Sequence, residues 1–164
     1  MLRIIGALVL SAAACLYGFF ISTGIKRKIA AEDGFLMLIT YIKIMISAGN
    51  MPLNKIYSSF SDGELERNGF LNDLRNGGCN AFYEIMTKKG TEYIADREIR
   101  ELIVSFSGQI GACPLASDGV RLCEKYISLV ENRISGIREN DKTRALLSKK
   151  LGIIAGAFIL VMFI

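Results

Sequence analysis

Two carboxylates, Glu98 and Glu101, have the spacing that could most directly support catalysis. Residues three apart on a helix share one face, so this pair could act as general acid and general base. Nothing nearby in the sequence indicates that either group is tuned for proton transfer, and a solvated helix face explains both. Asp96, just before them, is interpreted as the N-terminal cap of the helix. We therefore expect no catalytic residue in this segment.

Motifs of the common reaction classes are missing. The sequence contains no GxxxxGK phosphate loop, no histidine, no nucleophile elbow and no SxxK motif. The cysteines form no CxxC pair and are interpreted as reduced thiols in or near the core, with a Cys113–Cys123 disulfide as the alternative; they are Cys15, Cys79, Cys113 and Cys123. We expect a protein that is not an enzyme and that binds no cofactor and no metal.

An apolar segment near the N-terminus is the next feature that bears on function. It runs from Ile4 to Ile25, and as a helix it would be about 33 Å long, enough to cross a hydrocarbon core of about 30 Å. A cleaved signal peptide would have a shorter apolar region. A lipoprotein signal would place a lipid on Cys15, but Ala12 stands where leucine is usual. We favour an uncleaved anchor.

The C-terminus is a second apolar segment, from Ser148 to Ile164. Its uncharged part would reach only about 21 Å as a helix, so whether it fully spans the bilayer stays open. Gly152 and Gly156 lie four residues apart, a pattern that lets another helix approach closely. The first anchor or a partner subunit could supply that helix, and lipid-facing flexibility is the alternative reading.

Basic residues lie at the end of each apolar segment that is nearer the middle of the chain. These membrane-boundary residues are Lys26, Arg27, Lys28, Lys149 and Lys150. The positive-inside rule places such residues in the cytoplasm. We therefore predict a transmembrane anchor at residues 1–25, a cytoplasmic helical domain at residues 26–147 and a C-terminal transmembrane segment at residues 148–164.

Helical patterns fill the chain between the two anchors. Apolar residues at spacings of three and four predict helices over residues 29–48, 53–60, 64–76, 79–89 and 97–110. Gly49-Asn50 predicts a left-handed end for the first of these, after which Pro52 opens a new turn. Gly90 ends the helix over 79–89, and Gly111 with Pro114 ends the next one.

The last predicted helix is very long. Ser117 or Asp118 caps it, and the polar stretch after Ile137 contains no proline, so the helix can continue into the membrane. The fold class is therefore all-α, with a cytoplasmic helical bundle flanked by N- and C-terminal transmembrane helices.

The arrangement resembles the stage III sporulation protein AB family over nearly the full chain. The resemblance rests on the opening MLRIIGALVL, on ISAGNMPLNKIYSSF, on DREIRELIVSFSGQIG and on the ending KKLGIIAGAFILVMFI. The matching positions are Gly49, Pro52, Leu53, Asp96, Gly111, Leu151, Gly152 and Gly156. The chain departs from the family in having no tryptophan, in carrying Ile110 where leucine is usual, and in having no glutamine in ACPLASDG.

This resemblance implies a component of a secretion-like channel in the mother-cell membrane that faces the forespore. Members of the family are similar to the F-type platform proteins of type II secretion and type IV pilus systems. The implied partners are other proteins of the same operon, notably the AA ATPase, which leads us to expect a non-enzymatic platform or scaffold protein. The alternative is a membrane-tethered regulator or sensor that binds a cytoplasmic signalling protein.

Two segments are candidates for the partner contact. One is the turn with Gly49 and Pro52, and the other is the start of the helix that carries Asp96, Arg97, Arg100 and Glu101. We expect contacts with membrane lipid and none with nucleic acid, because the net charge of +4 is concentrated beside the apolar ends. A homo-oligomer is compatible with the sequence.

Overall fold

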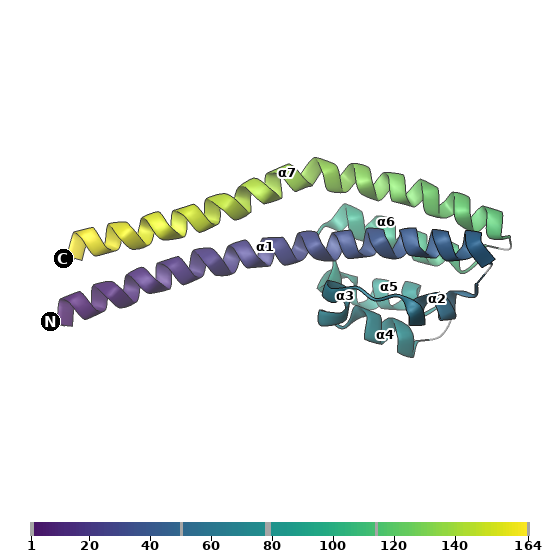
Figure 1. Cartoon of the computed structure of the whole chain (residues 1–164), viewed down its shortest axis with the longest axis horizontal. Coiled ribbons are helices and arrows are strands. Elements are labelled where there is room, and N and C mark those ends of the chain that lie inside the picture. The colour runs from purple at the N-terminus through teal and green to yellow at the C-terminus, as the bar shows by residue number, and fades with distance from the viewer. Residues whose placement is uncertain (1, 50, 78–79, 114, 164) are drawn as a thin grey trace. The chain divides into compact units, whose positions relative to one another are not determined.

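A computed structural model describes residues 2–49, 51–77, 80–113 and 115–163. Every secondary-structure element in these ranges is an α-helix (Figure 1). In order they are α1 Leu2–Gly49, α2 Leu53–Ser59, α3 Gly63–Arg67, α4 Phe70–Asn76, α5 Ala81–Tyr93, α6 Arg97–Ile110 and α7 Ala116–Phe163. The predicted all-α fold class is confirmed.

The chain divides into two compact units. The terminal unit contains residues 1–29 and 137–164, and the helical domain contains residues 30–136. The first and last helices each contribute to both units, because α1 and α7 are 48 residues long. No proline interrupts either helix, so the backbone hydrogen-bond ladder can continue through the charged stretches near residues 26–33 and 138–150.

Aromatic rings from five helices form the core of the helical domain. Phe70 of α4 contacts Phe35 of α1, with ring centroids 4.7 Å apart, and also Phe82 of α5 at 5.7 Å. From Phe82 the contacts continue to Phe106 of α6 at 6.1 Å and from there to Tyr126 of α7 at 5.5 Å. Most of these pairs meet edge to face, the geometry that aromatic quadrupoles prefer. Burial of these large side chains holds the helices together.

The predicted helix over residues 64–76 is two helices. Gly69 separates α3 from α4 and adopts a left-handed backbone with φ of 84°. Helices of L-residues cannot continue through such a φ, so the chain turns there. Asn68 assists, since its side-chain oxygen accepts a hydrogen bond of 3.0 Å from the backbone N–H of Phe70. The Asn-Gly pair is the local signal for this turn.

One predicted helix end, at Gly90, is wrong, and Gly49 has a different backbone conformation from the one predicted. Helix α5 continues through Gly90 to Tyr93. Gly90 is buried within this helix, and a Cβ atom there would lie 3.1 Å from Cδ of Arg100. Gly90 is thus a packing residue and not a helix terminator. Gly49 is the last residue of α1 and does not have the positive φ expected of it.

The start of α7 also differs from the prediction. Neither Ser117 nor Asp118 is its cap, since the helix begins at Ala116 and both residues lie in its first turn. An acidic residue in that turn still favours the helix electrostatically. The predicted roles of Asn50, Cys79 and Pro114 concern positions outside the described residues.

Candidate functional site

Glycines in the terminal unit bring α1 and α7 into backbone contact. A Cβ atom at Gly18 would lie 2.6 Å from the carbonyl oxygen of Ser148 and 2.9 Å from Cα of Gly152. A Cβ atom at Gly152 would lie 3.0 Å from the carbonyl oxygen of Ala14. The two helices run beside each other in this unit (Figure 1). At these two positions glycine, which has no side chain, allows such an approach.

The same contact surface extends further along both helices. A Cβ atom at Gly156 would lie 2.7 Å from Sγ of Cys15 and 3.0 Å from the carbonyl oxygen of Ser11. The thiol of Cys15 donates a hydrogen bond of 3.7 Å to the carbonyl oxygen of Gly152. We call this surface the small-residue seam; its buried members are Ser11, Gly18 and Ser22 on α1 and Ala145, Gly152 and Gly156 on α7.

An ion pair continues the seam beyond its small residues. Nζ of Lys28 lies 3.1 Å from Oδ2 of Asp141, and the exposed fractions of the two side chains are 29% and 13%. Lys28 therefore differs from the four other predicted membrane-boundary residues. Lys26, Arg27, Lys149 and Lys150 are all exposed.

The faces of the terminal unit opposite the seam are apolar and exposed. On α1 these side chains include Leu16, Tyr17, Phe19 and Phe20, and on α7 they include Leu151, Ile153, Ile154 and Phe158, each more than half exposed. The part of α1 from Leu8 to Gly49 is long and apolar enough to cross a membrane, and its apolar window has a mean hydropathy of 1.9. Exposed apolar surface of this extent is typical of a membrane-contacting segment.

In the helical domain, Asp96 caps α6 as predicted. Its carboxylate accepts hydrogen bonds of 3.0 Å from the backbone N–H groups of Glu98 and Ile99. The guanidinium of Arg133 on α7 lies 3.4 Å from the same carboxylate and 3.0 Å from that of Glu98. Burial raises the pKa of Asp96, but the hydrogen bonds from Ile99 and Arg133 outweigh it and hold the pKa below its ordinary value. Asp96 therefore fixes the start of α6 and ties it to α7.

The other candidate residues on α6 differ in exposure. Arg97 and Glu101 form an exposed pair at 2.7 Å, one turn apart. Arg100 is half-buried, since its stem packs on Gly90 and its guanidinium donates a 3.0 Å hydrogen bond to the carbonyl oxygen of Ile94. Arg100 and Glu101 line a groove of about 510 Å³ between α5 and α6, together with residues such as Tyr83.

The Gly49–Pro52 turn has a simpler environment. Both residues are exposed, and a Cβ atom at Gly49 would meet nothing within 4 Å. Pro52 stands at the N-cap of α2, where its carbonyl oxygen accepts backbone hydrogen bonds from Lys55 and Ile56. Among the hydrogen bonds and ion pairs of the described residues, none that we identify joins this turn to the start of α6.

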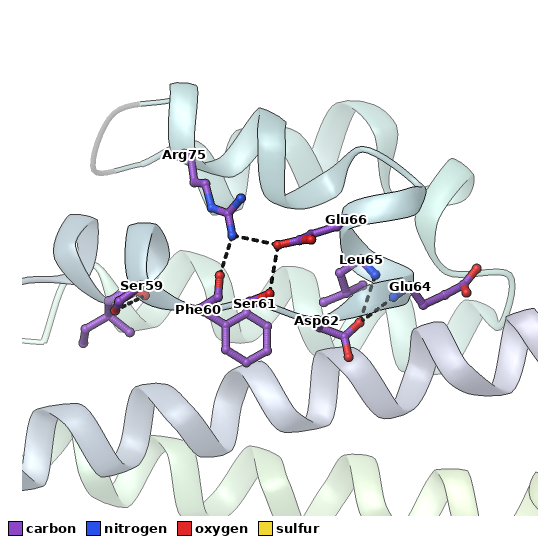
Figure 2. Close-up of polar contacts among 9 residues, drawn as sticks. Ser59, Phe60, Ser61, Asp62, Glu64, Leu65, Glu66 and Arg75 are labelled. Carbon is purple, nitrogen blue, oxygen red and sulfur yellow. Dashed lines mark hydrogen bonds and ion pairs between the residues drawn. The ribbon is translucent and has the colours of Figure 1, made fainter.

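Sequence reasoning missed a polar cluster that joins α2, α3 and α4. Arg75 of α4 donates a 2.6 Å hydrogen bond to the carbonyl oxygen of Phe60 and a 3.1 Å bond to Glu66, which also accepts one from Ser61 (Figure 2). Beside it, Asp62 caps α3 by accepting from two backbone N–H groups. The Ser61-Asp62-Gly63 sequence signals the cap, but no local pattern signals the contacts of Arg75.

A second missed cluster joins α4 to α5. The carboxylate of Asp73 accepts hydrogen bonds of 2.7 Å from Lys89 and 2.9 Å from Tyr93. The hydrogen bond from Lys89 lowers the pKa of Asp73 the most, and the hydrogen bond from Tyr93 lowers it further. Burial and the contact with Asp73 raise the pKa of Tyr93 to about 12. These polar contacts stabilise helix packing.

The two carboxylates considered for catalysis are each paired with an arginine. Glu98 contacts Arg133 and Glu101 contacts Arg97. No group of three His, Cys, Asp or Glu residues in the described part of the chain could hold a metal ion. The thiols of Cys15, Cys113 and Cys123 are free, and burial raises the pKa of Cys123 to about 12.

Comparison with protein families gave a match over almost the whole chain. The family model described as stage III sporulation protein AB matches residues 3–164. The comparison with curated proteins found no match, and neither did the comparison with solved structures.

Proposed function

The chain belongs to the stage III sporulation protein AB family, and from this premise we propose that it is a non-enzymatic membrane platform that docks a cytoplasmic ATPase. The family implies a role in sporulation. The proposed platform stands in the mother-cell membrane facing the forespore, as part of a secretion-like channel. Its partner is the AA ATPase of the same operon.

The observation that carries the proposal is the construction of the terminal unit. Two helices pack through the small-residue seam and leave apolar side chains such as Phe20 and Phe158 exposed. Water disfavours that arrangement, whereas hydrocarbon accepts it at no cost. It supports a second span formed by the end of α7, beside the span formed by α1. A span that is short by a few residues is accommodated by local thinning of the bilayer.

The charge distribution supports a cytoplasmic helical domain. Lys26 and Arg27 follow the first apolar segment, and Lys149 and Lys150 precede the second, so the basic residues lie on the domain side of both. The domain holds free thiols at Cys113 and Cys123, as expected in a reducing compartment.

Cysteine labelling of intact cells tests this topology. Lys88 is 73% exposed on α5, and Lys88→Cys in a chain without other cysteines supplies a reactive probe. We expect a membrane-impermeant maleimide to label it only after the cells are lysed. Labelling in intact cells would place the domain outside and contradict docking of a cytoplasmic ATPase.

For the ATPase contact we propose the exposed face of α6 beside the α5–α6 groove. Arg97 and Glu101 are exposed charges there, with exposed side-chain fractions of 82% and 61%. Because the two residues pair with each other, exchanging them keeps the pair and the net charge while reversing the charge at each position. The variant Arg97→Glu/Glu101→Arg should therefore remain folded but bind the ATPase less well.

Co-purification from sporulating membranes measures that loss. The matched control exchanges charges elsewhere, with Lys55→Glu on α2 and Glu131→Lys on α7, both exposed positions. We expect the AA ATPase to be retained by wild type and by the control and to be lost from the α6 variant. Equal retention by all three would exclude this face as the docking surface.

A further inference from the structure

The outer face of α1 in the terminal unit carries an apolar groove of about 630 Å³. Its lining includes Ala13, Leu16, Tyr17, Phe20, Gly24 and Arg27. These residues recur at spacings of three and four and so form one stripe along the helix. The groove lies away from α7, because Phe20 is two residues, or about 200°, around the helix from Gly18 in the seam.

Small residues give the groove its depth. A Cβ atom at Gly24 would meet nothing within 4 Å, so space at this position is not filled by other described side chains. Large rings lie beside it, with Tyr17 exposed by 69% and Phe20 by 77%. A flexible hydrocarbon chain can fill such a shallow, uneven surface, and the contact removes no hydrogen bond.

A cation closes one end of the groove. Arg27 is exposed and forms no hydrogen bond or ion pair with another described residue that we identify. Its neighbours differ: Lys28 is paired with Asp141, and Lys26 is exposed but does not line the groove. An apolar groove that ends in a guanidinium complements a molecule with an acyl chain and an anionic headgroup.

We propose that this groove binds one anionic phospholipid, with an acyl chain along Ala13–Gly24 and the phosphate on Arg27. The inference rests on the membrane insertion of α1. Gly24 lies eleven positions after Ala13, a rise of about 16 Å along the helix. This is close to the depth of one leaflet, which is about half of 30 Å. The groove therefore matches the acyl chain of one leaflet in length, and Arg27 at its end matches the phosphate of the headgroup, which favours a lipid.

Lipid retention in reconstituted protein tests the proposal. The full chain is placed in vesicles of phosphatidylglycerol and phosphatidylcholine, gently extracted, and its retained lipids are identified by native mass spectrometry. We expect phosphatidylglycerol to be enriched about fivefold over its vesicle fraction, which corresponds to about 1 kcal/mol for one interfacial arginine. No enrichment would overturn the inference.

Charge-matched variants separate the groove from general surface charge. Arg27→Gln and Lys26→Gln each remove one positive charge at the same membrane depth, but only Arg27 lines the groove. We expect enrichment to fall to the vesicle ratio in Arg27→Gln and to persist in Lys26→Gln. An equal fall in both variants would mean non-specific attraction and would refute the site.

Filling the groove tests the acyl-chain part. Gly24→Leu adds a side chain inside the groove, and Gly6→Leu adds the same side chain at another position where a Cβ atom meets nothing within 4 Å. Retained lipid should decrease in Gly24→Leu and not in Gly6→Leu. Cross-linking of a probe at Gly24 to a protein helix, instead of to lipid, would contradict the proposal.

Failure of the platform function would be recognised separately. If the wild-type chain is extracted from vesicles by alkaline carbonate, α1 is not inserted, and the membrane platform fails together with this inference. If the chain resists carbonate and retains both lipids in the vesicle ratio, only the lipid site fails.

Discussion

At the scale of single residues, Gly69 has a backbone conformation that other residues rarely adopt. Its φ of 84° is costly for any residue with a Cβ atom. We expect Gly69→Ala to lower the free energy of unfolding by about 1–2 kcal/mol, measured by urea unfolding in detergent. The control is Gly63→Ala at the start of α3, where a Cβ atom meets nothing within 4 Å. Equal losses in both variants would contradict a special role of the turn.

Asp96 combines a cap with a charge contact, and two substitutions separate them. Asp96→Ala removes both and should cost about 0.5–2 kcal/mol at pH 7. Asp96→Asn keeps a side-chain oxygen for the N–H groups of Glu98 and Ile99 but loses the ionic contact with Arg133, so its loss should be smaller. Asp96→Ala unfolding at the same urea concentration as wild type would exclude a stabilising cap.

The pH dependence of this contribution has a definite sign. The folded-state pKa of Asp96 lies below its ordinary value, so the ionised carboxylate stabilises the folded protein above the unfolded pKa of about 3.9. That stability is lost as the pH falls through the folded pKa. Urea unfolding should therefore show wild type and Asp96→Asn converging in acid; a constant difference down to pH 2 would contradict the linkage.

At the scale of elements, close approach of α1 and α7 depends on the glycines of the seam. In Gly152→Leu the new side chain would meet the backbone of Ala14 and Gly18, and backbone cannot move aside as a flexible side chain can. Overpacking of this kind costs about 1–3 kcal/mol or more. We expect a clear fall in the thermal unfolding midpoint in detergent.

The matched control for the seam is Gly136→Leu, because a Cβ atom at Gly136 meets nothing within 4 Å. Its midpoint should stay close to that of wild type. A Gly152→Leu variant as stable as this control would show that the helices do not need the seam.

The continuity of α7 is a second property at this scale. The helix extends without interruption from Ala116 to Phe163, and we expect it to transmit tilt or rotation from the helical domain to the membrane. Inserting Gly-Gly after Asn140 introduces two residues that each disfavour helix by about 1 kcal/mol relative to alanine. Sporulation should fall with Gly-Gly. Ala-Ala, which adds the same rise and rotation but keeps the helix, is the comparison.

The two insertions distinguish stiffness from register. If Gly-Gly impairs sporulation more than Ala-Ala, stiffness of α7 matters. If sporulation is unchanged with Gly-Gly, α7 does not act as a rigid coupling element.

At the scale of the whole molecule, Lys28 and Asp141 join the first and last helices across 113 positions of sequence. A double-mutant cycle with Lys28→Ala and Asp141→Ala should give a coupling energy of about 1 kcal/mol in thermal unfolding, since the pair is partly buried. The exposed pair of Lys88 and Glu84 within α5 is the control and should give about 0.3–0.5 kcal/mol. A Lys28–Asp141 coupling no larger than the control would contradict its role in joining the helices.

Much of the helical pattern follows from contiguous residues, and sequence alone predicted it. Asp96 caps α6 because its side chain reaches N–H groups only two and three residues away. Apolar stripes likewise indicated that residues such as Phe106 and Val130 face a core. The boundaries near Gly69 and Gly90 were wrong for opposite reasons: a left-handed turn was overlooked at the first, and a packing contact was interpreted as a helix end at the second.

By itself, the sequence therefore determined an all-helical chain with apolar ends, basic boundaries and no recognised catalytic motif, because helix propensity and hydropathy are properties of neighbouring residues. The tertiary structure decided which distant groups meet. It paired Lys28 with Asp141 and left Arg27 exposed beside the groove, and it placed Asp73 against Tyr93. Such contacts depend on how helices pack, and no local pattern among three adjacent charges indicates which of them will find a partner.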